Sequence, residues 1–198
     1  MLLSTSHNFL FIAVPKTASS SVELALQGYH NASRAEPLGK HALAMEVTDH
    51  LAPSELAALF KFGFVRNPYS WMWSWYRFRQ RPELSNPAHR HHDRYAGDMD
   101  FDEFMKVFNR GQVFLKQSDF LFSHQDEQLV DFVGRFETLE QDLEAVCERL
   151  QVPAPALERV NSSGGAAFDP SAIGSDARNL INQHFHRDFE LFGYEMLE

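Results

Sequence analysis

The stretch that decides the fold is Phe9-Leu-Phe-Ile-Ala-Val14, which runs into Pro15-Lys16-Thr17-Ala18-Ser19-Ser20-Ser21. The apolar run predicts a buried strand over 9–14, and the serines predict the start of a helix over 19–27. At such a junction the first backbone N–H groups of the helix lack partners, and the helix dipole favours anions. The segment therefore predicts an anion site to which Lys16 adds a cation, although a serine-rich helix cap that binds nothing is the simpler alternative.

A second segment repeats this pattern about fifty residues later. Phe62-Gly-Phe-Val-Arg66 runs into Asn67-Pro68-Tyr69-Ser70 and on to Ser74. It predicts a strand over 61–66 and a helix from Pro68 to Arg79 that is capped by Asn67. Arg66 then lies at the carboxyl edge of the sheet, where open α/β folds bind ligands and where its planar fork suits a phosphate. A structural ion pair for Arg66 and an ordinary helix hydroxyl for Ser74 stay open.

Strands and helices alternate along the rest of the chain. Further helices are predicted over 53–60, 101–109, 139–150 and 177–188, a strand over 129–136, and loops over 29–40, 80–98 and 161–176. This order predicts a single α/β domain over residues 1–198, with a central parallel sheet flanked by helices.

Composition narrows the class of protein. The chain has 198 residues, 44% of them hydrophobic, and one cysteine, Cys147, which we assign to the core and which excludes an intrachain disulfide. The apolar run over 9–14 is too short to cross a membrane, and we expect a cytoplasmic protein without a membrane partner. The net charge is −9, and no broad basic stripe indicates a nucleic-acid partner. Residues 1–96 hold ten Lys and Arg against seven Asp and Glu, so both anion sites lie in the basic half.

One cluster has the composition of a metal site. His89, His91, His92 and Asp93 lie close together in the sequence, but their spacing matches no standard zinc site and no cysteine is near. We interpret the cluster as part of a solvated loop and expect no metal in this protein.

Taken together, the two segments resemble the cofactor-binding loops of sulfotransferases that use 3′-phosphoadenosine 5′-phosphosulfate (PAPS). Val14–Ser21 is similar to the family's 5′-phosphosulfate loop, and Phe64–Tyr69 with Ser74 is similar to its 3′-phosphate motif. Weaker similarities extend over nearly the whole chain, at 40–41, 117–119, 135–139, 160–163 and 188–194. The closest type is family 2, which includes small bacterial members and the carbohydrate 2-O-sulfotransferases, and it implies a P-loop nucleotide-kinase-like fold.

The resemblance also implies an activity and its residues. A sulfuryl group would pass from PAPS to a hydroxyl of a small-molecule or carbohydrate acceptor, leaving adenosine 3′,5′-bisphosphate. Lys16 would stabilise the leaving phosphate and His41 would be the base, although sequence alone does not prefer His41 over His50, and Glu46 is a further alternative. The implied cofactor-binding residues are Pro15, Lys16, Thr17, Ala18, Ser19, Ser20, Ser21, Arg66, Ser74, Asn161 and Ser162.

The sequence departs from the family pattern at two places. Ser19 stands where many relatives have glycine, so a positive φ there would be strained. Ser70-Trp71 stands where many members have Asp-Arg.

Two other functions stay open. A nucleotide-dependent kinase or NTPase would need a Walker loop and Mg²⁺ carboxylates, which the sequence does not show. A non-catalytic nucleotide-binding module would keep the loops without a base. The sequence decides neither the acceptor nor the oligomeric state.

Overall fold

The structure is a computed structural model that describes residues 1–29, 38–111, 115–158 and 168–198. The chain divides into two compact units, each described here by itself. The first unit comprises Met1–Arg66 and Leu115–Asn161, and the second comprises Asn67–Phe114 and Ser162–Glu198. The predicted single-domain organisation stays a prediction.

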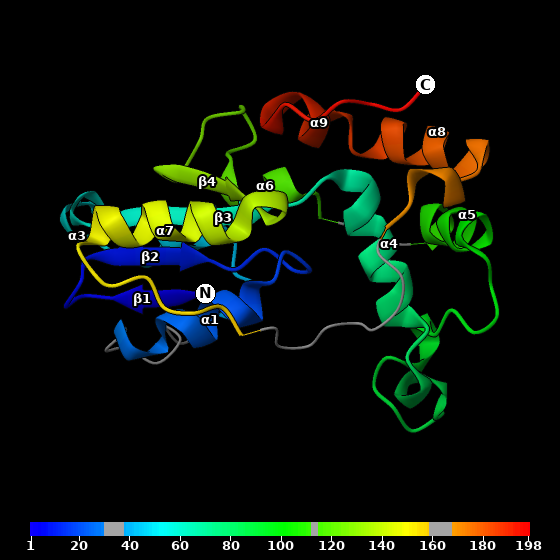
Figure 1. Cartoon of the computed structure of the whole chain (residues 1–198), viewed down its shortest axis with the longest axis horizontal. Coiled ribbons are helices and arrows are strands. Elements are labelled where there is room, and N and C mark those ends of the chain that lie inside the picture. Colours follow the sequence, from blue (N-terminus) through cyan, green and yellow to red (C-terminus); the bar gives the residue numbers. More distant parts are fainter. Residues whose placement is uncertain (30–37, 112–114, 159–167) are drawn as a thin grey trace. The chain divides into compact units, whose positions relative to one another are not determined.

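A four-stranded sheet forms the centre of the first unit (Figure 1). Its strands are β1 (Leu2–Ser4), β2 (Phe9–Ile12), β3 (Phe60–Val65) and β4 (Phe132–Arg135), in the order β1-β2-β3-β4. Strands β2, β3 and β4 are parallel, which confirms the predicted α/β class with a mainly parallel sheet. Strand β1 was not predicted, and it pairs antiparallel with β2, so the sheet is not wholly parallel.

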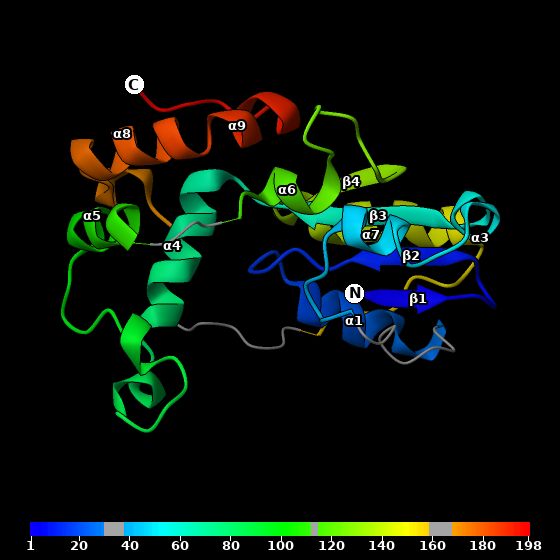
Figure 2. The ribbon, with the colours of Figure 1, turned by 180° about the vertical axis from the view of Figure 1, so that it is seen from behind.

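Helices cover both faces of this sheet. The helices of the first unit are α1 (Ser19–Leu26), α2 (Ala44–Thr48), α3 (Pro53–Ala58), α6 (Gln117–Leu121) and α7 (Leu139–Leu150). On one face, Phe11 and Phe62 form a core with Val22 of α1 and with Cys147 of α7, which is buried as predicted. Figure 1 shows α7 across this face, and Figure 2 shows α6 on the opposite side.

Gly63 explains how α6 approaches the sheet so closely. A Cβ atom built at Gly63 would lie 2.6 Å from Cδ2 of Leu121 in α6. Real Cβ atoms do not come so near another carbon, so a larger residue at Gly63 would force the Leu121 side chain to move. The absence of a side chain at Gly63 therefore leaves room for Leu121 of α6 against β3.

The second unit is helical. Its helices are α4 (Pro68–Arg79), α5 (Phe101–Gly111), α8 (Ser175–His184) and α9 (His186–Phe192), with short 3₁₀ helices at Pro82–Ser85, His92–Arg94 and Pro170–Ala172. Trp71, Met105, Phe185 and Phe189 meet in its core. Asn67 caps α4 as predicted, since its Oδ1 accepts hydrogen bonds from the backbone N–H groups of Tyr69 and Ser70 at 3.0 and 3.4 Å.

The end of the chain corrects one prediction. The single helix expected over 177–188 is two helices, α8 and α9, which meet at Phe185. The start of α8 is capped from another helix: the carboxylate of Asp102 in α5 accepts hydrogen bonds from the N–H groups of Gly174 and Ala177, at 3.2 and 3.0 Å. This cap comes from a distant part of the sequence, which explains why local patterns did not predict it.

Candidate functional site

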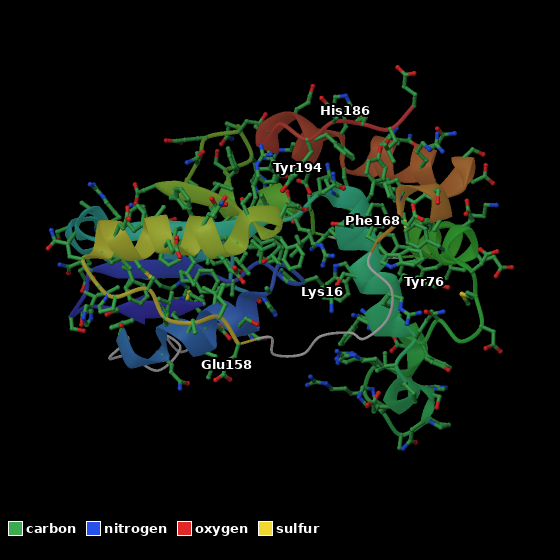
Figure 3. All side chains as sticks on the ribbon, in the orientation of Figure 1. Lys16, Tyr76, Glu158, Phe168, His186 and Tyr194 are labelled. Atoms are coloured by element: carbon green, nitrogen blue, oxygen red, sulfur yellow. The ribbon has the colours of Figure 1, made fainter. Side chains whose placement is uncertain are left out.

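The turn between β2 and α1 has the backbone of an anion-binding loop. Lys16, labelled in Figure 3, has φ 65°, and Ala18 has φ 61°, whereas Thr17 between them has a negative φ. Such an alternation of positive and negative φ is typical of turns whose successive backbone N–H groups point at one bound anion. Each left-handed non-glycine residue costs about 1–2 kcal/mol. Strain of this kind is typical of functional sites.

Hydrogen bonds within the turn stabilise it. The hydroxyl of Thr17 is buried and donates a hydrogen bond to the carbonyl of Val14 at 3.0 Å. The N–H of Ser21 donates to the carbonyl of Ala18 at 2.9 Å, which starts α1. Ser19 is not strained, because the positive φ angles fall at Lys16 and Ala18 and Ser19 is the first residue of the helix.

The parallel register brings Arg66 to this turn. Ile12 pairs with Gly63, so Pro15 and Arg66 each lie three positions beyond this pair. Nη1 of Arg66 donates to the carbonyl of Lys16 at 3.5 Å. The guanidinium also lies over the ring of Phe136, 4.0 Å from its centre, just after β4. Three consecutive strands therefore contribute to one cationic edge.

Gln117 holds the backbone of Arg66 in place. This fully buried side chain accepts a hydrogen bond from the N–H of Arg66 at 2.8 Å and donates one to its carbonyl at 2.7 Å. The amide therefore pairs with Arg66 as a neighbouring strand would. Gln117 was part of a weak similarity in the sequence, but the sequence did not predict its role, because the two residues are 51 positions apart.

His41 also lies beside the turn. Its Nδ1 is 2.6 Å from the carbonyl oxygen of Ala13, the residue that follows β2. Because a carbonyl can only accept, Nδ1 carries the proton and Nε2 keeps a lone pair that can act as a base. Partial desolvation lowers the pKa of His41, and the charge of Lys40 acts in the same direction, whereas the bond to Ala13 opposes both. The lowered pKa favours the neutral form of the ring, in which Nε2 is unprotonated.

The two alternative bases have other roles. Nδ1 of His50 donates to the carbonyl of Glu46 at 2.8 Å, near the end of α2. The carboxylate of Glu46 accepts a hydrogen bond from the N–H of Leu43 at 2.7 Å and so caps the start of α2. The residue that bonds the backbone next to the Lys16 turn is His41.

Lys40 is a residue of this region to which the sequence analysis assigned no role of its own. Its ammonium donates to the hydroxyl of Ser20 at 2.9 Å and pairs with the carboxylate of Glu23 at 2.7 Å. Burial acts to raise the pKa of Glu23, but the bond to Lys40 and the nearby positive charges outweigh it, so the pKa is lowered. The adjacent Lys40-His41 pair, already noted in the sequence, was the available signal for this second cation.

Three further predicted site residues stay predictions: Ser74, Asn161 and Ser162. Ser74 is buried in α4, which belongs to the second unit, so its contact with a 3′-phosphate stays a prediction. Asn161 and Ser162 lie outside the described residues.

Within the described residues, no three His, Cys, Asp or Glu side chains come together as metal ligands. In the predicted His89–Asp93 cluster, Nδ1 of His89 accepts from the N–H of His91, and Nδ1 of His92 lies 2.9 Å from the carbonyl of Leu84. No helix in the described part of the chain has the length and apolarity that crossing a membrane requires.

Comparison with known proteins identifies the family of this chain. No curated protein and no solved structure matches this chain. A sequence model of the sulfotransferase family matches residues 1–195, almost the whole length. The chain therefore belongs to the sulfotransferase family.

Proposed function

We propose that this sulfotransferase moves a sulfuryl group from PAPS to a hydroxyl of a small-molecule or carbohydrate acceptor. The observation that carries the proposal is the strained turn at Lys16 and Ala18, which adjoins Arg66 at the carboxyl edge of the sheet. A backbone anion site next to two cations suits a ligand with separated phosphate and sulfate groups. PAPS supplies the sulfuryl group, and adenosine 3′,5′-bisphosphate is the product that leaves.

Two groups of residues would hold the donor. Pro15–Ser21 would surround its 5′-phosphosulfate with backbone N–H groups, hydroxyls and the Lys16 ammonium. Arg66 and Ser74 would bind its 3′-phosphate, with Asn161 and Ser162 nearby. The edge described above fits this assignment, because the Arg66 fork already lies against the Lys16 backbone and is held over Phe136.

The chemistry falls to Lys16 and His41. Nε2 of His41 takes the proton of the acceptor hydroxyl as its oxygen forms a bond to sulfur. Lys16 stabilises the negative charge that appears on the phosphate oxygen as the sulfur–oxygen bond to the donor breaks. Positive charge from Lys16 and the turn is sufficient for this role, so we propose a mechanism without a metal.

The fold and location complete the proposal. We infer a single domain with the P-loop nucleotide-kinase-like arrangement of sulfotransferases, and a cytoplasmic location, with which the single cysteine is consistent.

Calorimetry with adenosine 3′,5′-bisphosphate, and separately with ATP and Mg²⁺, tests the donor assignment. We expect the bisphosphate to bind more tightly, and we expect Lys16→Met and Arg66→Met each to weaken it by roughly ten- to hundredfold, the value of a charged hydrogen bond. Arg149→Met is the control, because Arg149 lies in the last turn of α7, away from the Lys16 turn and Arg66. Tighter binding of ATP with Mg²⁺ would support the kinase or NTPase alternative and overturn our proposal.

A transfer assay separates the enzyme from a binding module. The wild type and His41→Ala are incubated with PAPS and a panel of hydroxyl acceptors, and sulfated products are detected by mass spectrometry. We expect products from the wild type, and from His41→Ala a loss of transfer with normal nucleotide binding. Equal transfer by both proteins would remove His41 from the mechanism, and nucleotide binding without any transfer by the wild type would favour the module.

A further inference from the structure

The second unit contains a buried cation without a polar partner. Arg79 lies in the last turn of α4 and is only 6% exposed. Its guanidinium lies over the rings of Trp75 and Phe78, at 5.4 and 5.6 Å. Among the described residues, no carboxylate, hydroxyl or carbonyl forms an ion pair or hydrogen bond with this guanidinium. Arginines are rarely buried unless they are paired, so this one requires an explanation.

Positive charge accumulates around Arg79 although the protein is acidic. Residues 77–94 contain five arginines and two acidic residues, in a chain whose net charge is −9. The Arg81 guanidinium lies over the same Phe78 ring, 4.9 Å from its centre. The N–H of Ala96 bonds to the carbonyl of Arg79 at 3.0 Å, which ties the end of the following loop to α4.

The nearest acidic group does not neutralise this region. Asp93 pairs with Arg94 at 3.5 Å, and its side chain is 68% exposed. The C-terminus of α4 adds only about half a negative charge. An excess of positive charge therefore remains.

The pKa of His91 is also affected by this group of positive charges. Desolvation lowers its pKa, and the charges of Arg90, Arg79, Arg94 and His89 lower it further. Arginines of the loop and of α4 thus act on one imidazole ring.

We propose that Arg79, together with Arg81 and Arg94, forms a binding site for a carboxylate or sulfate group of an organic ligand. When an arginine stacks on aromatic rings through its flat face, the N–H groups along the edge of the guanidinium can still donate hydrogen bonds. Two of these N–H groups fit the two oxygens of a carboxylate or sulfate. The exposed neighbours Arg94 and Asp93 mark the side from which a ligand enters. The site belongs to the second unit, whereas the Lys16 turn and His41 belong to the first, so the inference goes beyond the proposed function.

Nuclear magnetic resonance of the full chain, without PAPS, tests this site by itself. The arginine Nε–H signals and the tryptophan indole signals are followed during titration with glucuronate and with inorganic sulfate, and glucose serves as the uncharged control. We expect saturable shifts at Arg79 and Trp75 with both anions and none with glucose. Signals of the Lys16 turn are followed separately, so anion binding there is not confused with binding at Arg79.

Two variants and one control complete the test. Arg79→Met keeps the apolar stem and removes the charge, and we expect it to weaken glucuronate binding at Trp75 by about tenfold or more, the value of one charged hydrogen bond. Arg149→Met is matched, because Arg149 also lies in the last turn of a helix and over a phenylalanine ring, 5.9 Å from the centre of Phe60. It should leave binding unchanged.

If Arg79→Met does not fold, Arg94→Gln at the exposed side is used in its place. We expect this variant to bind glucuronate several-fold more weakly than the wild type. The proposal is overturned if no saturable shift appears at Arg79, or if the folded variants bind glucuronate as tightly as the wild type. Arg79 would then only pack against the aromatic rings. Because no transfer is measured, failure here is distinct from failure of the proposed enzymatic activity.

Discussion

Replacement of Gln117 by leucine should separate the position of Arg66 from its charge. Leucine fills a similar volume but leaves the N–H and the carbonyl of Arg66 without the bonds of 2.8 and 2.7 Å that they make now. Each backbone group left unpaired costs about 1–3 kcal/mol when it is buried. The two groups of Arg66 are partly buried, so the free energy of unfolding should fall by about 2–4 kcal/mol, a large part of the total stability of a typical protein.

The affinity for the nucleotide should fall as well, because the backbone that carries the Arg66 guanidinium is no longer held in place by Gln117. We expect calorimetry with adenosine 3′,5′-bisphosphate, at a temperature where the variant is folded, to show a loss approaching that of Arg66→Met, roughly tenfold or more. Gln128→Leu is the control, since Gln128 also bonds a backbone carbonyl, that of Val130 at 2.7 Å, but away from the site. It should lower stability slightly and leave affinity unchanged.

The Gln117→Glu variant gives a test that a general loss of stability cannot imitate. A protonated glutamic acid can still accept from the N–H of Arg66 and donate to its carbonyl, whereas the carboxylate would oppose that carbonyl. Affinity in this variant should therefore be nearer to the wild type at low pH and fall as the pH rises, relative to the wild type at each pH. If Gln117→Leu destabilises the protein but binds the bisphosphate normally while Arg66→Met does not, Gln117 does not position Arg66.

Three further predictions follow from the first unit. The rate of sulfuryl transfer should fall toward acidic pH, because protonation of His41 removes the base. Since the pKa of His41 is lowered, this fall should be centred below the ordinary value of 6.5. In a pH–rate profile, the acidic limb should be absent from His41→Ala. Ala18→Gly should raise the free energy of unfolding, measured by chemical denaturation, by up to about 1 kcal/mol, because glycine accepts φ 61° without strain. Ala18→Val should lower this free energy. Equal stability of the two variants would contradict the left-handed geometry. Gly63→Ala should cost about 1–3 kcal/mol, since the new Cβ would meet Leu121 at 2.6 Å, and an added Leu121→Ala should recover part of that loss in the same assay.

The elements that the sequence predicted best have strong local signals. The helix over Pro68–Arg79 has both its cap and its proline in sequence, and α7 carries a clear apolar stripe. Strand β1 and helices α2 and α6 are too short to show periodicity, and they depend on contacts with the sheet. The apolar spacing of Ile181, Phe185 and Phe189 continues across the break between α8 and α9, so the pattern predicted one helix.

The candidate site divides in the same way. The Lys16 turn and Arg66 follow from strands that end in polar residues, a pattern visible in the sequence. The left-handed angle at Ala18 could not be predicted, because alanine has no special tolerance for it. The preference for His41 over His50, and the bond from Gln117 to Arg66, depend on which distant segments the sheet brings together.

The contacts of Arg66 have a consequence for how the protein folds. Its partners Lys16, Gln117 and Phe136 are 50, 51 and 70 positions away, so closing them costs chain entropy that local structure does not repay. The edge that we propose to bind the donor should therefore form late, after β2, β3 and β4 have aligned. A nucleotide that binds only this finished edge would act on the equilibrium between folded and unfolded chains, and would raise the melting temperature as its concentration increases.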